Sequence, residues 1–197
     1  MNIIDTQKGI ELQNIEHHHH DNTEENHKDN SESLDPHSWL DPSLAKIMAQ
    51  NIYDGLIRFY PADSLMFQDN LNLLLEDLDK IDSYIKRELE PYTGRSFYTF
   101  HPAFGYFAKA YDLKQMSIEF EGKEPSARQL ADIIKKAEED KIEILFTQPQ
   151  FSDKSARAIA ESVGAAVIPI DPLSKDYLNN LKEITKQLVL VDRKSVV

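Results

Sequence analysis

Four short apolar runs in the second half of the chain decide the fold: SFYTF at 96–100, QMSIEF at 115–120, IEILFT at 142–147 and AAVIPI at 165–170. Each run has the length and the β-branched or aromatic content of a strand. Helical patterns separate the runs, and strand–helix alternation of this length predicts a parallel sheet with helices on its faces. The sequence therefore predicts an α/β lobe built on a four-stranded parallel sheet.

Helical patterns also precede this lobe. Asp41 has the character of an N-cap and Pro42 that of a first helical residue, so a helix is expected over 42–59. Apolar residues then recur at steps of three and four, which predicts a second helix over 65–90 that is about 35–40 Å long. Such a helix could be a spine between two lobes or an ordinary bundle helix. Residues 3–12 are expected to form a short strand with a turn at Gly9.

The composition narrows the function classes. The 197 residues include 22 Lys and Arg against 34 Asp and Glu, which gives a formal net charge of −12. Such an acidic chain is a poor candidate for general binding of nucleic acids or anionic membranes. Cysteine is absent, which excludes disulfides, zinc-finger cages, iron–sulfur ligation and a cysteine nucleophile. No apolar run approaches the ~20 residues of a membrane helix, and the first residues lack a signal-peptide pattern.

Histidine is concentrated in one polar segment. Residues 13–33 contain almost nothing apolar, and we expect them to form a mobile loop. Five histidines of this loop, together with neighbouring acidic residues, are expected to bind transition metals weakly by multidentate chelation. They are His17, His18, His19, His20 and His27. Four consecutive histidines are also typical of an expression tag, but their position inside the chain favours a natural metal-attracting loop.

Metal-ligand residue types follow two of the predicted strands. Groups that bind ligands in parallel α/β sheets lie beyond the carboxyl ends of the strands. His101 follows the first run and Asp171 follows the last, so both are expected at the same edge of the sheet. His37 lies just before the helix at 42–59, and the neighbouring Trp39 would hold its imidazole still. Two imidazoles and a carboxylate suit Zn²⁺ and, with more oxygen ligands, Mn²⁺ or Fe²⁺.

Each of these residues also has a purely structural interpretation. His101 could end a strand and pack there, His37 could be a polar loop residue, and Asp171 could cap a helix or a turn. Asp35 is expected to be a cap, and Glu119 a solvated loop carboxylate.

Several motifs resemble the zinc/manganese-type (cluster A-I, ZnuA-like) solute-binding proteins of bacterial ABC importers. They are the His-rich segment, DPHSWLDP at 35–42, FHPAFGYFAKAYDL at 100–113, EPSARQLADIIK at 124–135, QPQFSDKSARAIAESVGA at 148–165 and IDPL at 170–173. The resemblance implies two α/β lobes joined by a long rigid helix, with the metal in the cleft. It also implies that His37, His101 and Asp171 reach the metal, and the His-rich segment favours Zn²⁺ over Mn²⁺.

The same resemblance implies a division of the chain into three parts. Residues 1–62 would be the remnant of a truncated N-terminal lobe, 63–92 the interlobe helix and 93–197 the C-terminal lobe. The family's first metal-binding histidine comes from the N-terminal lobe and has no counterpart here. A truncated lobe should expose apolar surface, especially on the helix at 42–59, and should favour self-association.

The function implied is that of a binding protein and not of an enzyme. It would capture zinc outside the cytoplasm, in the periplasm or at the cell surface on a lipid anchor, and deliver it to the permease of an ABC importer. One alternative is a metal-dependent hydrolase, in which an open coordination position activates water and Glu119 or Glu121 acts as general base. Another is an adhesin-like surface protein with a structural metal site.

Overall fold

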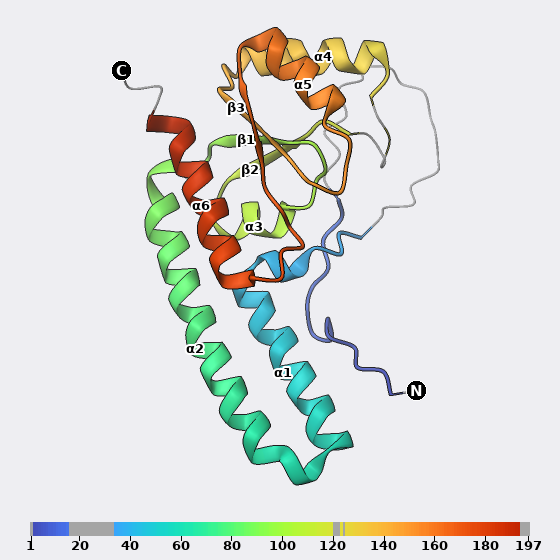
Figure 1. Cartoon of the computed structure of the whole chain (residues 1–197), viewed down its shortest axis with the longest axis vertical. Helices are drawn as coiled ribbons and strands as arrows, with labels where there is room; N and C mark the ends of the chain where they lie inside the picture. Colours follow the sequence, from blue (N-terminus) through green and yellow to red (C-terminus); the bar gives the residue numbers. More distant parts are fainter. Residues whose placement is uncertain (1, 16–33, 120–122, 124, 194–197) are drawn as a thin grey trace.

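The structure, a computed structural model, describes residues 2–15, 34–119, 123 and 125–193 (Figure 1). A hairpin of two helices, α1 (Pro42–Phe59) and α2 (Ser64–Leu89), projects from an α/β lobe in Figure 1. Within the residues of the lobe that the structure describes, the further α-helices are α3 (Gly105–Ala110), α4 (Ala127–Glu139), α5 (Lys154–Val163) and α6 (Tyr177–Arg193). In the described part of the chain, no helix is both long and apolar enough to cross a membrane.

The sheet confirms the predicted fold class. Its strands are β1 (Ser96–Thr99), β2 (Lys114–Ser117), β3 (Ile144–Thr147) and β4 (Ala166–Pro169). They are all parallel and lie in the order β2-β1-β3-β4. The chain moves from β1 outward to β2 and then crosses to β3 on the other side of β1. The strand order therefore reverses between β1 and β3, which is where ligands bind in open parallel sheets.

Both faces of the sheet are covered by helices. Successive strand residues point to opposite faces, so Phe97 packs with α2, α3 and α6, whereas Tyr98 packs with α4 and α5. β3 does the same with Phe146 and Leu145. Figure 1 shows α4 and α5 together on one side of the sheet and α6 alongside α2 on the other. Two apolar layers thus enclose the sheet, as a parallel sheet requires.

The two hairpin helices begin and end close to their predicted limits. The Asp41 carboxylate caps α1 by accepting a hydrogen bond from the Ser43 backbone N–H at 2.7 Å. α2 has 26 residues, and one face of it is buried. The buried residues are Leu71, Leu78, Ile81, Ile85 and Leu89. Because they recur at helical spacing, they form one apolar face from Leu71 to Leu89.

The predicted strand over 3–12 is wrong. These residues, all of which the structure describes, contain a turn at Thr6–Gly9 and no strand. The Asn51 side-chain amide on α1 donates hydrogen bonds to the carbonyl oxygens of Thr6 and Lys8, both at 2.9 Å. These bonds hold the segment in a turn against α1. Of the segment predicted to be a mobile loop, residues 16–33 lie outside the described residues.

The exposed apolar surface is also placed differently from the prediction. We expected it chiefly on α1, where Ile52 is exposed. The most exposed apolar side chains of the hairpin lie instead on the first half of α2, where Leu65 is 81% exposed and Leu73 62%. The interior face of α1 is better covered than expected because α2 packs along it.

Replacing Ile85 by alanine should destabilise the protein by about 2–5 kcal/mol. Ile85 is completely buried in the larger core cluster, so its removal leaves a cavity between α2 and the sheet. Leu65→Ala on the same helix is the matched control and should change the free energy of unfolding by no more than about 0.5 kcal/mol. Denaturant unfolding measures both. Equal effects of the two substitutions would contradict the buried face assigned to α2.

Candidate metal centre

His101 lies at the point where the strand order reverses. It follows β1, and Gln148 follows β3, which pairs with β1. The His101 backbone N–H donates to Gln148 Oε1 at 3.0 Å, and Gln148 Nε2 donates to the His101 carbonyl oxygen at 2.8 Å. Because Gln148 is buried, these two hydrogen bonds fix the backbone of His101 relative to β3.

His37 is held by a short 3-10 helix, Ser38–Leu40, that leads into α1. The Trp39 indole N–H donates to the Pro172 carbonyl oxygen at 3.0 Å, which ties this turn to the segment after β4. The Tyr177 hydroxyl donates to the Trp39 carbonyl oxygen at 2.6 Å. Burial raises the pKa of Tyr177, so the hydroxyl keeps its proton and remains a donor.

The two histidine rings meet, and each has a carboxylate behind it. Their centroids are 5.2 Å apart with the planes 75° to each other. Nδ1 of His37 lies 2.7 Å from Asp35 Oδ1, and Nδ1 of His101 lies 2.7 Å from Glu119 Oε1. A carboxylate can only accept, so each Nδ1 carries a proton, and in the neutral ring Nε2 is then the nitrogen with the lone pair. This arrangement is typical of histidines that bind a metal through Nε2.

Both carboxylates are placed differently from the predictions. Glu119 was expected to be solvated, but it is only 5% exposed and its side chain is committed to His101. Asp35 was expected to be a cap, but it is 2% exposed and bonds the ring and the backbone N–H of His37. The start of α3 comes so close that a Cβ on Gly105 would lie 2.8 Å from Asp35 Oδ2. A glycine is therefore required there for Asp35 to stay beneath His37.

Asp171 is also firmly held. Its Oδ1 accepts hydrogen bonds from Gln150 Nε2 at 2.6 Å and from the Leu173 backbone N–H at 3.0 Å. Its carbonyl oxygen accepts from Asn180 Nδ2 at 2.6 Å. The side chain is partly exposed. Asp171 therefore has a defined orientation before any ligand arrives.

The structure brings two of the three predicted ligands together. Among the residues it describes, no group of three or more His, Cys, Asp or Glu side chains is placed to hold a metal ion. His37 and His101 therefore form a pair, and Asp171 lies outside it, linked through the Trp39–Pro172 hydrogen bond.

The second, weak site predicted in the His-rich segment lies outside the described residues. All five of its histidines fall within residues 16–33: His17, His18, His19, His20 and His27. The weak metal binding expected of them therefore stays a prediction from the sequence.

Two residues at the site were not predicted. Phe151 stacks on the His101 ring at 4.5 Å between centroids and 24° between planes, and Gln150 holds Asp171. Both lie in the segment directly after β3, where the strand-end rule applies. Their position directly after a strand could therefore have marked them as site residues, although glutamine and phenylalanine do not by themselves suggest a metal site.

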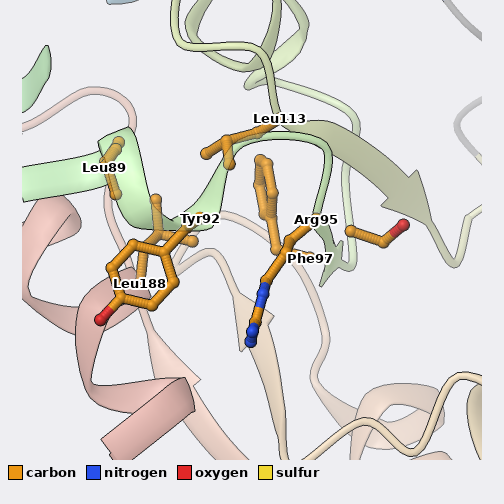
Figure 2. Close-up of a pocket in the computed structure, with 7 residues that line it drawn as sticks. Leu89, Tyr92, Arg95, Phe97, Leu113 and Leu188 are labelled. Carbon is orange, nitrogen blue, oxygen red and sulfur yellow. The ribbon is translucent and has the colours of Figure 1, made fainter.

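Two hollows lie at the opposite end of β1 from His101. One is an apolar cavity of about 40 Å³, shown in Figure 2, whose lining includes Leu89, Tyr92, Arg95, Phe97, Leu113 and Leu188. The other, of about 290 Å³, shares Arg95 and Phe97 with it and extends to Lys141. Both are near the amino ends of strands, so neither forms part of the candidate metal centre.

An α/β lobe with two carboxylate-backed imidazoles at its strand-order reversal has the features of a protein that binds a divalent metal ion. The family model described as ZnuA, zinc-uptake complex component A, periplasmic, matches residues 1–190. The chain belongs to this family.

Individual relatives agree with this assignment. The zinc-binding protein AdcA of Streptococcus pyogenes is 32% identical over 165 residues, which cover 79% of this chain and 32% of AdcA. A crystal structure of ZnuA superposes with a TM-score of 0.86 at 34% identity and covers 96% of this chain and 69% of that one. The chain thus spans about a third of the length of AdcA and about two thirds of that ZnuA chain.

A third relative carries a further activity in its description. The laminin-binding protein Lmb of Streptococcus agalactiae is described as bifunctional, with adhesin and metal-transporting activity. It superposes with a TM-score of 0.80 at 27% identity and covers 95% of this chain and 69% of its own.

Replacing Glu119 by leucine should change the tautomer of His101. The substitution removes the acceptor at Nδ1, so part of the population should move its proton to Nε2, the nitrogen that would bind a metal. Long-range ¹H–¹⁵N NMR of the imidazoles measures the change. His37, which keeps Asp35, is the internal control and should remain protonated on Nδ1. A His101 ring that is unchanged in the variant would contradict the role assigned to Glu119.

Proposed function

We propose that this chain is the metal-binding part of an extracytoplasmic solute-binding protein that captures Zn²⁺ and delivers it to the permease of an ABC importer. The observation that carries the proposal is the His37–His101 pair, in which both Nδ1 atoms are bonded to buried carboxylates, so that Nε2 of each neutral ring is the nitrogen that can bind a metal. The names of AdcA and of the ZnuA family support zinc as the cargo, and the family description supports a place in the periplasm.

Asp171 is the third ligand in this proposal. It follows β4 at the same edge of the sheet as His101, and Pro172 is tied to the turn that carries His37. Two nitrogens and one carboxylate oxygen leave the fourth position of a tetrahedral zinc ion for water or for another group. Imidazole ligands favour Zn²⁺ over Mn²⁺, because Mn²⁺ prefers sites that are rich in oxygen ligands.

The division of the chain remains part of the proposal. Residues 1–62 would belong to an N-terminal lobe, 63–92 would be the interlobe helix and 93–197 the C-terminal lobe. The packing of α2 against both α1 and α6 supports a central role for this helix. A long helix packed along both sides can keep the parts of the site on either side of it in register.

A hydrolase is not supported by the geometry. Glu119 bonds the ring of His101 and is buried, so it is not free to activate water as a general base. Glu121, the other candidate, lies outside the described residues. The relatives are named for zinc binding and metal transport, not for catalysis. Adhesion is part of the description of Lmb, but no described feature of this chain favours it as a second function.

Zinc titration by calorimetry with a competing chelator tests the proposal directly. We expect one tight zinc site in the parent chain. In His101→Ala the zinc affinity of this site should fall by about 100-fold or more, because losing a ligand should weaken binding at least as much as losing a group that supports a ligand. The matched control replaces all four histidines of the run His17–His20 by serine and should remove only weak binding. Weak binding alone, unchanged by His101→Ala, would overturn the proposal.

We also expect the isolated chain to self-associate through the exposed face of α2. Burial of Leu65 and Leu73 in a dimer would remove apolar surface from water. Size-exclusion chromatography with light scattering at micromolar concentration should show a dimer. The double variant Leu65→Gln/Leu73→Gln should be a monomer, whereas Leu190→Gln on α6, also exposed, should have no effect. A monomeric parent chain would contradict the expectation.

A further inference from the structure

The Asp171 carboxylate is held by one oxygen only. Among the described residues, the donors to this carboxylate are Gln150 Nε2, at 2.6 Å, and the Leu173 backbone N–H, at 3.0 Å, and both bond Oδ1. The lone pairs of Oδ1 that lie in the carboxylate plane are therefore engaged. Oδ2 is the oxygen that remains for a cation.

Gln150, the side-chain donor to Oδ1, lies in a turn whose backbone is fixed. Gln148, Pro149, Gln150 and Phe151 form a tight turn, in which the Phe151 backbone N–H donates to the Gln148 carbonyl oxygen at 3.1 Å. Proline in the second position of such a turn fixes the backbone. The Gln148 side chain is bonded to the backbone of His101, and the Phe151 ring is stacked on its imidazole. The backbone of Gln150 is thus positioned relative to His101 from both ends of the turn, and its exposed side chain reaches Asp171 from there.

The coordination number of a bound metal depends on whether a carboxylate ligand binds through one oxygen or through both. One oxygen with two imidazole nitrogens gives three protein ligands and suits a four-coordinate zinc ion. A carboxylate with both oxygens free can bind in a bidentate mode and raise the coordination number, which suits the oxygen-rich, higher-coordinate sites preferred by Mn²⁺.

We propose that Gln150 is a positioning residue that sets metal selectivity: by occupying Oδ1, it limits Asp171 to monodentate binding through Oδ2 and favours Zn²⁺ over Mn²⁺. This inference rests on the proposed function, because it takes Asp171 as a ligand. It adds a group that touches no metal and acts only through the carboxylate.

The test compares Gln150→Leu with Gln50→Leu. Leucine has a similar size but no donor, so one lone pair of Oδ1 becomes available to the metal while the Leu173 backbone N–H keeps the other. Gln50 makes the same type of exposed hydrogen bond, to Asp54 Oδ1 at 2.9 Å on α1, away from the candidate site, and is the matched control. Chelator competition gives the affinities for Zn²⁺ and Mn²⁺. Visible absorption of the Co²⁺-loaded protein reports the coordination number.

We expect the ratio of zinc to manganese affinity to fall by about tenfold in Gln150→Leu, at the lower end of effects seen for groups behind metal ligands. The intense Co²⁺ bands of a four-coordinate site should weaken as the coordination number rises. Neither readout should change in Gln50→Leu, and in an Asp171→Ala background Gln150→Leu should have no further effect. An unchanged ratio and an unchanged Co²⁺ spectrum in Gln150→Leu would overturn the inference.

Failure of the proposed function gives a different result. In that case the parent chain shows no tight zinc binding that depends on His101 or Asp171, and the inference falls with it. Tight zinc binding that requires both residues but is indifferent to Gln150 overturns the inference alone.

Discussion

Two buried carboxylates need partners, and the site is organised around that requirement. A carboxylate that is removed from water without a hydrogen-bond donor is strongly destabilising. Asp35 and Glu119 are both almost completely buried, and each finds a donor in the Nδ1–H of a histidine. The same bonds fix the orientation of both imidazoles and, in the neutral rings, leave Nε2 as the nitrogen with the lone pair. Folding and the ordering of the two imidazoles are therefore coupled here.

The parts of the site come from distant segments that tertiary hydrogen bonds join. His37 precedes α1, whereas His101 follows β1, and their rings meet because Trp39 is bonded to Pro172 and to Tyr177. Gly105 allows α3 to approach Asp35 without a clash. The reversal of strand order between β1 and β3 puts His101 at the edge of the sheet where ligands bind in open parallel sheets. Each contact is modest, but together they leave the imidazoles little freedom.

The sheet could be predicted because each strand is a self-contained apolar run. The rule that ligand-binding groups lie beyond the carboxyl ends of parallel strands selected His101 and Asp171 as candidate ligands. The prediction of a strand over 3–12 is wrong because Asn51, far away in sequence, donates hydrogen bonds to two carbonyl oxygens of this segment and holds it in a turn. The role of Glu119 was missed for a similar reason. Whether a carboxylate is solvated or buried depends on what packs over it, and sequence spacing does not contain that information.

Trp39 gives the protein an optical property that follows from its place in the fold. It is the single tryptophan of the chain, so indole fluorescence comes from one ring only. That ring lies 5.3 Å from His37, centroid to centroid, and its N–H is bonded to the residue after Asp171. Indole emission responds to hydrogen bonding and local polarity at this position. The two halves of the site therefore share one intrinsic fluorophore, and its emission reports on their separation without any label.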